Sequence, residues 1–178
     1  MKYYMEKLYL AQVDKNNAVI GQVERWQAHE KGILHRGFTV ILFYDNQIVL
    51  QHRRHPAFDK FWDMTFSSHP IYINNVLQPD SAAIADSLKR EWSIDENGLD
   101  AGLKFLGKIY YKAKDPHSVY TEHEIDYIYL AELKDKPRPN PEYAYSFELV
   151  SKLEIENRKL KIDLTPWVEK IIEGIDIL

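Results

Sequence analysis

A run of seven mostly apolar residues, Phe38–Tyr44, limits the folds that are open to this chain. A helix that crosses a membrane needs about 20 apolar residues, so a run of this length indicates a buried strand. A second apolar segment, 47–53, begins directly after Asp45–Asn46, a pair that favours a tight turn. The two segments therefore predict a β-hairpin.

Further strand signals lie before and after this hairpin. Strand patterns cover four more segments: 7–13, 18–24, 106–113 and 124–133. The first two flank the turn-forming residues 14–17, which predicts a second hairpin. A proline-rich stretch, Lys134–Tyr143, is too short to separate domains, and we expect one more strand and two helices after it.

Helical periodicity begins at Asp80. Ile84, Leu88 and Trp92 recur every four residues, which predicts an amphipathic helix over 81–93. Asp80 is the expected N-cap of this helix, because its short carboxylate can accept from free backbone N–H groups.

Two more helix starts lie near the end of the chain. Ser151 and Glu154 have the spacing of a capping box, and Thr165–Pro166 begins a final helix with proline in its first turn. Strands, a helix, more strands and terminal helices together predict an α+β fold, in which a curved mixed β-sheet is flanked by helices. The length of 178 residues fits a single domain over 1–178.

Composition excludes several functions. The formal net charge of −4 gives no general attraction to phosphate backbones or anionic lipid, so we expect neither a nucleic-acid nor a membrane partner. The chain has no cysteine, which excludes disulfides, thiolate metal sites and thiol nucleophiles. Glu6 and Lys7 interrupt the first apolar stretch, which is unlike a signal peptide, and we expect a cytoplasmic protein.

Five side chains stand out as candidate metal ligands: His29, His35, His69, Glu122 and Glu124. Glu122 and Glu124 are two apart on an expected strand, so both carboxylates point to one face and repel each other. A divalent cation would remove that repulsion, and a nitrogen and oxygen donor set suits Mg²⁺, Mn²⁺ or Zn²⁺. The alternative is that these are ordinary surface side chains, since spacing alone does not connect His69 with the others.

Four segments resemble type I isopentenyl diphosphate isomerase, a branch of the Nudix superfamily. They are ILHRGFTVILF (33–43), TFSSHP (65–70), YTEHEIDYIYLAEL (120–133) and LTPW (164–167). The resemblance extends from about Leu8 to the last helix. It implies a Nudix-type fold and an isomerase of isoprenoid biosynthesis that acts on a small prenyl diphosphate, as a monomer or small homo-oligomer.

The resemblance also assigns roles to individual residues. It implies that the five candidate ligands hold one divalent metal, most simply Mg²⁺, and that Glu91 helps to bind a second Mg²⁺ carried by the diphosphate. Arg25 corresponds to a basic residue near the diphosphate, and Arg53 could also meet phosphate. Glu124 with Tyr111 corresponds to the acid, and Trp167 to a tryptophan that faces the carbocationic intermediate.

The chain departs from the family pattern where the resemblance implies the opposing base. Ser67 occupies the position of the cysteine, and Met64 that of an asparagine. A serine hydroxyl is far less acidic than a thiol, so it makes a poor base and can only relay a proton. Asp86 and Ser87 also stand where the family helix carries arginines.

These features leave three functions open. The first is an isomerase of isopentenyl and dimethylallyl diphosphate, slowed or altered by Ser67. The second is a Nudix hydrolase of another organic diphosphate, although the helix keeps only Glu91 of the family's metal-binding set. The third is a non-catalytic descendant that binds metal or diphosphate.

Overall fold

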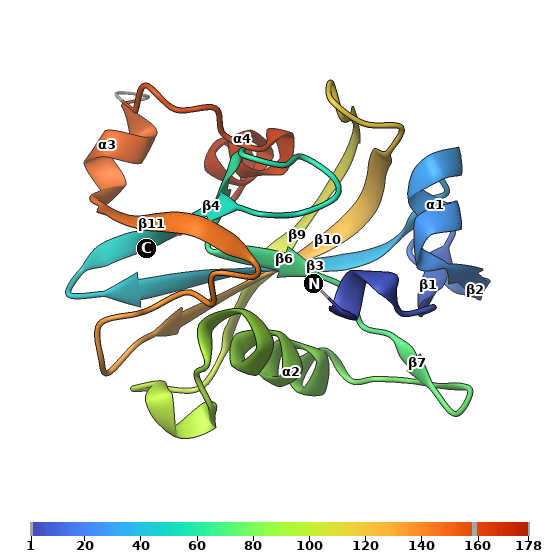
Figure 1. Ribbon diagram of the computed structural model, residues 1–178, viewed down its shortest axis with the longest axis horizontal. Coiled ribbons are helices and arrows are strands. Elements are labelled where there is room, and N and C mark those ends of the chain that lie inside the picture. The colour runs from blue at the N-terminus through green and yellow to red at the C-terminus, as the bar shows by residue number, and fades with distance from the viewer. Residues whose placement is uncertain (1, 158–159, 178) are drawn as a thin grey trace.

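A mixed β-sheet forms the framework of the protein (Figure 1). In the computed structural model, which describes residues 2–157 and 160–177, this sheet has nine strands. They are β1 (Tyr9–Val13), β2 (Val19–Glu24), β3 (His35–Tyr44), β4 (Gln47–Arg53), β5 (Trp62–Met64), β6 (Phe66–Ser68), β9 (Lys104–Lys114), β10 (Thr121–Glu132) and β11 (Ala144–Val150). A separate short ladder joins β7 (Tyr72–Ile73) to β8 (Val76–Leu77).

Short helices surround the sheet. They are η1 (Lys2–Met5), α1 (Arg25–Lys31), α2 (Asp80–Trp92), η2 (Glu96–Gly98), α3 (Lys152–Glu156) and α4 (Pro166–Gly174). Figure 1 shows α2 against one face of the sheet and α4 on the opposite side. The expected α+β fold with a curved mixed sheet is therefore confirmed. No helix among the described residues is long and apolar enough to cross a lipid bilayer.

Strand β3 is the centre of the sheet. One of its edges pairs in parallel with β10 over nine residue pairs. Its other edge pairs in turn with β1, β6 and β4. Strands that are far apart in the sequence therefore lie beside β3, and their side chains share the two faces of the sheet with those of β3.

The alternation of β3 separates two cores. Phe38 and Leu42 face α2, where Ile84, Leu88 and Trp92 provide the apolar stripe of that helix. Ile41 points to the opposite face and packs in the cluster that contains Ile128 and the α4 residues Trp167, Val168 and Ile171. His35 and Thr39 have the same parity as Ile41, so β3 presents polar groups on the α4 side.

Most of the expected elements are present. Both predicted hairpins form, the predicted capping box of Ser151 and Glu154 is made, and Pro166 begins α4. The prediction for Asp80 was wrong. Pro79 occupies the N-cap position, while Asp80 is the first helical residue and its carboxylate accepts a hydrogen bond from the Tyr129 hydroxyl at 2.7 Å.

Candidate active site

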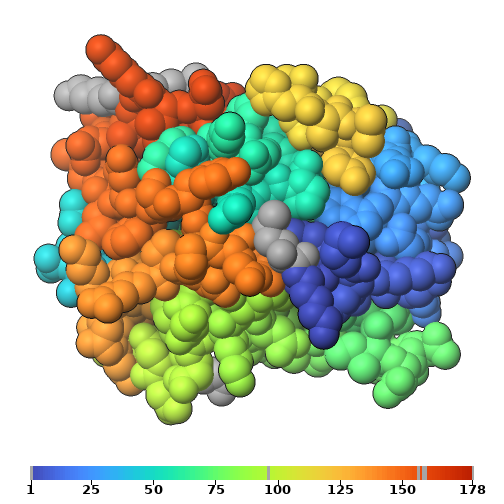
Figure 2. Space-filling view, viewed as in Figure 1, coloured from blue at the N-terminus to red at the C-terminus, as the bar shows by residue number. Residues whose placement is uncertain are grey.

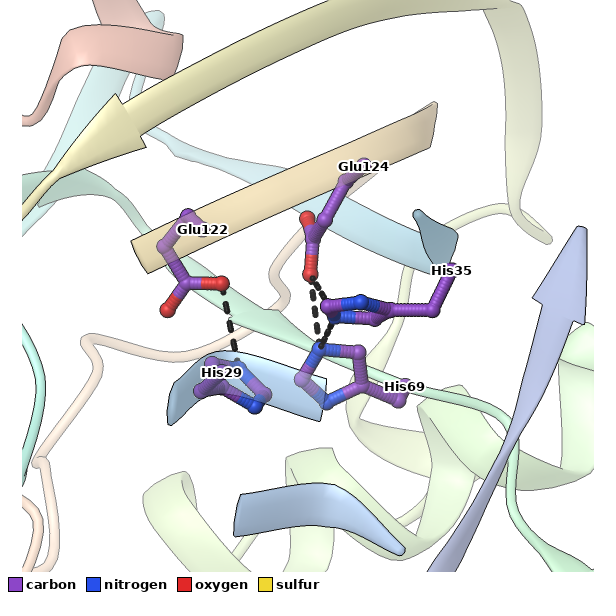
Figure 3. Close-up of side chains that lie close together, drawn as sticks. All are labelled: His29, His35, His69, Glu122 and Glu124. Carbon is purple, nitrogen blue, oxygen red and sulfur yellow. Dashed lines mark hydrogen bonds and ion pairs between the residues drawn. The ribbon is translucent and has the colours of Figure 1, made fainter. Parts of the chain in front are cut away.

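The five candidate metal ligands meet at one point although they come from four parts of the chain (Figure 3). His29 lies on α1, His35 begins β3, His69 follows β6, and Glu122 and Glu124 lie on β10. Each side chain offers one nitrogen or oxygen atom, and these five atoms all lie within 4.8 Å of one another. The folded chain therefore brings together the residues that spacing alone could not connect.

Strand register brings four of these residues together. The parallel pairing of β10 with β3 puts Glu124 directly beside His35, and strand alternation puts Glu122 on the same face as Glu124. The antiparallel pairing of β6 with β3 aligns Ser68 with Phe38, so the chain leaves β6 at His69 next to the start of β3. A Cβ atom at Gly37 would lie 2.5 Å from a carboxylate oxygen of Glu124, so a larger residue here would push this carboxylate out of its position in the cluster.

Helix α1 contributes the remaining ligand. The Glu24 side chain caps its N-terminus by accepting from the Gln27 N–H, and Gly32 ends it in the left-handed region with a φ of 58°. These caps fix a short helix whose inner face carries the buried ring of His29.

Two of the three imidazoles, those of His29 and His35, are oriented as metal ligands. Nδ1 of His29 lies 2.6 Å from the Arg25 carbonyl oxygen, and Nδ1 of His35 lies 2.7 Å from that of Ile33. A carbonyl only accepts, so each ring donates from Nδ1 and turns Nε2 toward the cluster. Backbone carbonyls that fix the tautomer in this way are the usual outer partners of metal-binding histidines.

The inner atoms crowd one another in a way that a cation would resolve. Nε2 of His35 and Nε2 of His69 are 3.3 Å apart, and both lie close to the same oxygen of Glu124, at 3.1 and 2.7 Å. Oε2 of Glu122 is 3.1 Å from Nε2 of His29 but accepts no well-formed hydrogen bond from a described residue. Three imidazole nitrogens and two carboxylates at this spacing fit a divalent cation.

Burial and charge shift the titration of these groups. Burial alone would lower the pKa of His29, but the negative charge of Glu122 close to its ring raises it to about 9. Burial would raise the pKa of Glu124, yet His69 and His35 hold it well below its usual range. Without a cation, the site therefore holds a proton on His29 and an ionised Glu124 at neutral pH.

Tyr111 is hydrogen-bonded to this cluster. Its hydroxyl donates to Oε2 of Glu124 at 2.6 Å, across the β9–β10 pairing that puts the two residues side by side. Burial and the negative charge of Glu124 raise the pKa of Tyr111 well above its ordinary value, so the phenol keeps its proton. Its ring stacks on Trp167 with centroids 5.5 Å apart.

A second polar network surrounds Ser67. Its Oγ lies 2.8 Å from Oγ1 of Thr39, its register partner across β3 and β6. The same oxygen is 3.0 Å from Oδ2 of Asp63 and accepts from the indole N–H of Trp167 at 3.0 Å. Thr39 Oγ1 is in turn 2.7 Å from Oδ2 of Asp126.

Charges in this network are distributed unevenly. Burial and the charge of Glu124 raise the pKa of Asp126 well above its ordinary value, which favours its neutral acid. Asp63 is instead bound by Nη1 of Arg53 at 2.6 Å in a fully buried ion pair. Arg53 therefore lies behind the site, over the ring of Trp167, and does not line the pocket next to the cluster.

That pocket is a small cavity of about 20 Å³ between the two networks. Its walls include the cluster residues His29 and His69, the serines Ser67 and Ser68, and the basic residues Arg25 and Arg90. Glu91 also lines it. The Glu91 carboxylate accepts from Arg90 at 2.9 Å and from Gln51 at 3.5 Å and is not one of the five clustered ligands.

The N-terminal segment covers the pocket. Arg25 donates from Nη2 to the carbonyls of Tyr3 at 2.9 Å and Glu6 at 3.2 Å, and the guanidinium of Arg90 lies 3.9 Å from the centre of the Tyr3 ring. Tyr4 packs its ring against those of His55 and Tyr143. Figure 2 shows this segment in dark blue, packed against α2 in green and the orange chain near residue 143.

Sequence reasoning missed several residues of the site. Asp126 lies two positions after Glu124, so strand alternation could have placed it on the ligand face. Arg90 directly precedes Glu91, and it puts a guanidinium at the pocket although Asp86 and Ser87 are not basic. Asp63 gave no local signal, because its role depends on contacts with β4, β6 and α4.

Comparisons with solved structures identify the fold. A protein of Deinococcus radiodurans superposes with a TM-score of 0.70 and 14% identity, covering 93% of this chain and 97% of the other. A MutT NUDIX hydrolase of Burkholderia pseudomallei gives a TM-score of 0.59 at 17% identity over 80% of this chain and 98% of the other. The fold and the ligand cluster thus define a Nudix-fold protein with side chains able to hold a divalent metal.

Sequence comparisons are more specific. No protein-family model matches the chain. It is 33% identical to the isopentenyl-diphosphate Delta-isomerase 1 of Bos taurus over 90% of its own length and 79% of the relative's. The chain belongs to the isopentenyl-diphosphate Delta-isomerase family, which confirms the resemblance read from the sequence.

Other members of the family are matched over different shares of their length. The Streptomyces griseus isopentenyl-diphosphate Delta-isomerase is 29% identical, over 95% of this chain and 84% of the relative. The chloroplastic isopentenyl-diphosphate Delta-isomerase II of Arabidopsis thaliana is 28% identical, and the match spans only 64% of that longer protein.

Proposed function

We propose that this protein interconverts isopentenyl and dimethylallyl diphosphate and that Ser67 replaces the cysteine of the family pattern. The observation that supports this most directly is the meeting of two proton-handling networks at one pocket. His29 and His69 bring the metal-ligand cluster to the pocket, and Ser67 brings the network of Asp63 and Trp167. Isomerising an unactivated double bond needs one group that delivers a proton and another that removes one.

Each group has a role in this scheme. His29, His35, His69, Glu122 and Glu124 would hold the cation, and Glu91 would help to hold a second Mg²⁺ brought in with the diphosphate. When bound, the cation would supply positive charge that offsets the neighbouring carboxylates and makes nearby protons more acidic. We propose Mg²⁺ as the working ion.

The proton donor is the pair of Tyr111 and Glu124. The phenol carries a proton at neutral pH and shares it with Oε2 of Glu124 over 2.6 Å. Delivery of this proton to the terminal carbon of isopentenyl diphosphate creates positive charge on the adjacent carbon. We propose that Trp167, whose ring stacks on Tyr111, stabilises such a charge through its π system.

The basic residues at the pocket suit a diphosphate. Nε and Nη1 of the buried Arg25 and Nε of Arg90 have no hydrogen-bond partner among the described residues. Buried guanidinium N–H groups without partners are costly, and phosphate oxygens would satisfy them. A cavity of about 20 Å³ holds about one water molecule, so the segment with Tyr3 and Tyr4 must move aside to admit a prenyl diphosphate.

Direct observation of the reaction tests this function. Purified protein is mixed with isopentenyl diphosphate and Mg²⁺ in D₂O and followed by ¹H and ³¹P NMR. We expect dimethylallyl diphosphate with deuterium in a methyl group. Glu124→Gln should abolish the signal, while His123→Gln, on the same strand with its Nδ1 bonded to the Gly32 carbonyl, should leave it unchanged.

Other outcomes of this experiment identify the alternatives. Release of monophosphate or inorganic phosphate would indicate a hydrolase, which is less supported because only Glu91 of α2 faces the pocket as an acid. Substrate that raises the melting temperature but stays unchanged would indicate a non-catalytic binding protein.

A further inference from the structure

The proposed isomerisation leaves one chemical problem at Ser67. The reaction must remove a proton from the carbon next to the cationic centre, and a serine hydroxyl is too weak a base to keep that proton. A second acceptor must therefore lie within reach of Ser67. The inference that follows rests on the proposed function.

Asp63 is placed to be that acceptor. Its carboxylate is completely buried and accepts hydrogen bonds on both oxygens. Oδ1 accepts from the backbone N–H of Met64 at 2.9 Å and from the indole N–H of Trp167 at 2.8 Å. Oδ2 accepts from Arg53 at 2.6 Å and from the Ser67 hydroxyl at 3.0 Å.

The donors around Ser67 fix the direction of its proton. The indole N–H of Trp167 can only donate, so Ser67 accepts that contact. Thr39 donates its proton to Asp126 and therefore does not occupy a lone pair of Ser67. The Ser67 proton can reach Oγ1 of Thr39 at 2.8 Å or Oδ2 of Asp63 at 3.0 Å, and the carboxylate is the stronger acceptor. Trp167 shares its N–H between Ser67 at 3.0 Å and Asp63 at 2.8 Å, and the shorter contact is to Asp63. Ser67 therefore keeps a lone pair with which it can take up a proton from the pocket.

Ser67 and Asp63 differ in their access to the pocket, and this difference assigns their roles. Ser67 lines the pocket, whereas Asp63 is fully buried behind it and does not. Asp126 is one step further away, because Thr39 lies between it and Ser67. Of the buried carboxylates in this network, only Asp63 contacts the Ser67 hydroxyl directly.

We propose that Asp63 is the proton acceptor of the isomerisation and that Ser67 relays the proton to it. The carbon–hydrogen electron pair forms the new double bond while the released proton moves to Oγ of Ser67. The original Ser67 proton moves at the same time to Oδ2 of Asp63, which becomes a neutral acid beside Arg53. In the reverse reaction each transfer runs backward.

The reaction does not need a strong base at this position. A hydrogen on the carbon next to a cationic centre is strongly acidic, so a modest acceptor suffices. Arg53 acts as a positioning residue, because its hydrogen bond to Oδ2 of Asp63 holds this carboxylate next to the Ser67 hydroxyl.

A double-mutant cycle tests the relay with two substitutions, Asp63→Asn and Ser67→Cys. In the wild-type background we expect Asp63→Asn to lower kcat by about 100-fold or more, the usual contribution of a general base, with little change in KM. In the Ser67→Cys background the thiolate accepts the proton itself. There Asp63→Asn should cost less than about tenfold in kcat.

A purely structural role of Asp63 would give a different pattern of kcat values in this cycle. If Asp63 only supports the fold, Asp63→Asn costs the same factor in both backgrounds, and the relay is refuted. Full activity of Asp63→Asn also refutes it. A wild-type protein and a Ser67→Cys variant that both leave isopentenyl diphosphate unchanged would refute the proposed function, and the relay with it.

Removal of one partner from a buried ion pair can unfold a protein. Should Asp63→Asn fail to fold, Arg53→Gln combined with Asp63→Asn removes both charges, and its kcat is compared with that of Arg53→Gln alone. The relay predicts a further loss of at least about tenfold on adding Asp63→Asn to Arg53→Gln. Equal kcat values for these two variants would contradict it.

Discussion

Proton release is the measurable cost of loading the metal-ligand cluster. Without a cation, Glu122 raises the pKa of His29 to about 9, so the ring carries a proton at neutral pH. A cation needs the Nε2 lone pair and must displace this proton. Neutral pH lies about two units below this pKa, so displacing the proton at neutral pH costs about 3 kcal/mol and lowers the affinity for the cation about 100-fold.

Calorimetric titration with Mn²⁺ measures this cost. Titrations in two buffers of different ionisation enthalpy give the number of protons released, and we expect about one proton per ion at neutral pH. The apparent affinity should rise about tenfold for each pH unit and level off near pH 9. His123→Gln is the matched control, because this ring on β10 lies outside the cluster and should leave the proton count unchanged.

The result that would refute this reasoning is also clear. If Mn²⁺ binds at neutral pH with no proton release and an affinity independent of pH, His29 is neutral in the metal-free protein. The close contact of 3.1 Å between His29 and Glu122 would then not carry the charge that we assign to it. His29→Gln should reduce the proton release of the wild type toward zero.

Three other substitutions give distinct outcomes. Tyr111→Phe removes the hydroxyl that donates to Glu124, so kcat should fall by about 100-fold or more while far-ultraviolet circular dichroism stays unchanged. Trp167→Phe keeps a ring but removes the shared N–H, and urea titration should show a loss of about 1–3 kcal/mol in the free energy of unfolding. Arg90→Gln should raise KM for the diphosphate about tenfold or more with a smaller effect on kcat, measured in steady-state assays.

Local patterns were sufficient for the long elements of the fold. The Asp45–Asn46 turn and the apolar strands around it predicted the β3–β4 hairpin, because a two-residue turn fixes the pairing of its neighbours. The three-residue strands β5 and β6 gave no such signal. Their pairing depends on contacts with β4 and β3. The single domain over 1–178 remains a prediction.

The candidate site was predictable only in part. Side-chain chemistry singled out His29, His35, His69, Glu122 and Glu124, the resemblance implied that they share one metal, and the structure brings these side chains together. Periodicity could not do so, because the parallel register of β10 on β3 joins residues almost 90 positions apart and is specified by the whole sheet.

The network around Ser67 was beyond local reasoning for a different reason. Asp63, Thr39 and Trp167 come from β5, β3 and α4, and their contacts exist only after the two cores have formed. The sequence indicated that Ser67 departs from the family pattern, but it could not indicate which side chains contact the Ser67 hydroxyl.

The hydroxyl of Ser67 has a consequence for chemical durability. A reactive thiolate at such a position is open to oxidants and alkylating reagents, whereas a serine hydroxyl resists both. The partners of Ser67 are oxygen and nitrogen groups, and Trp167, the ring most open to oxidation among them, is only 1% exposed. The protein should therefore keep its proton-transfer groups intact under peroxide or iodoacetamide that would inactivate a site built on a thiol.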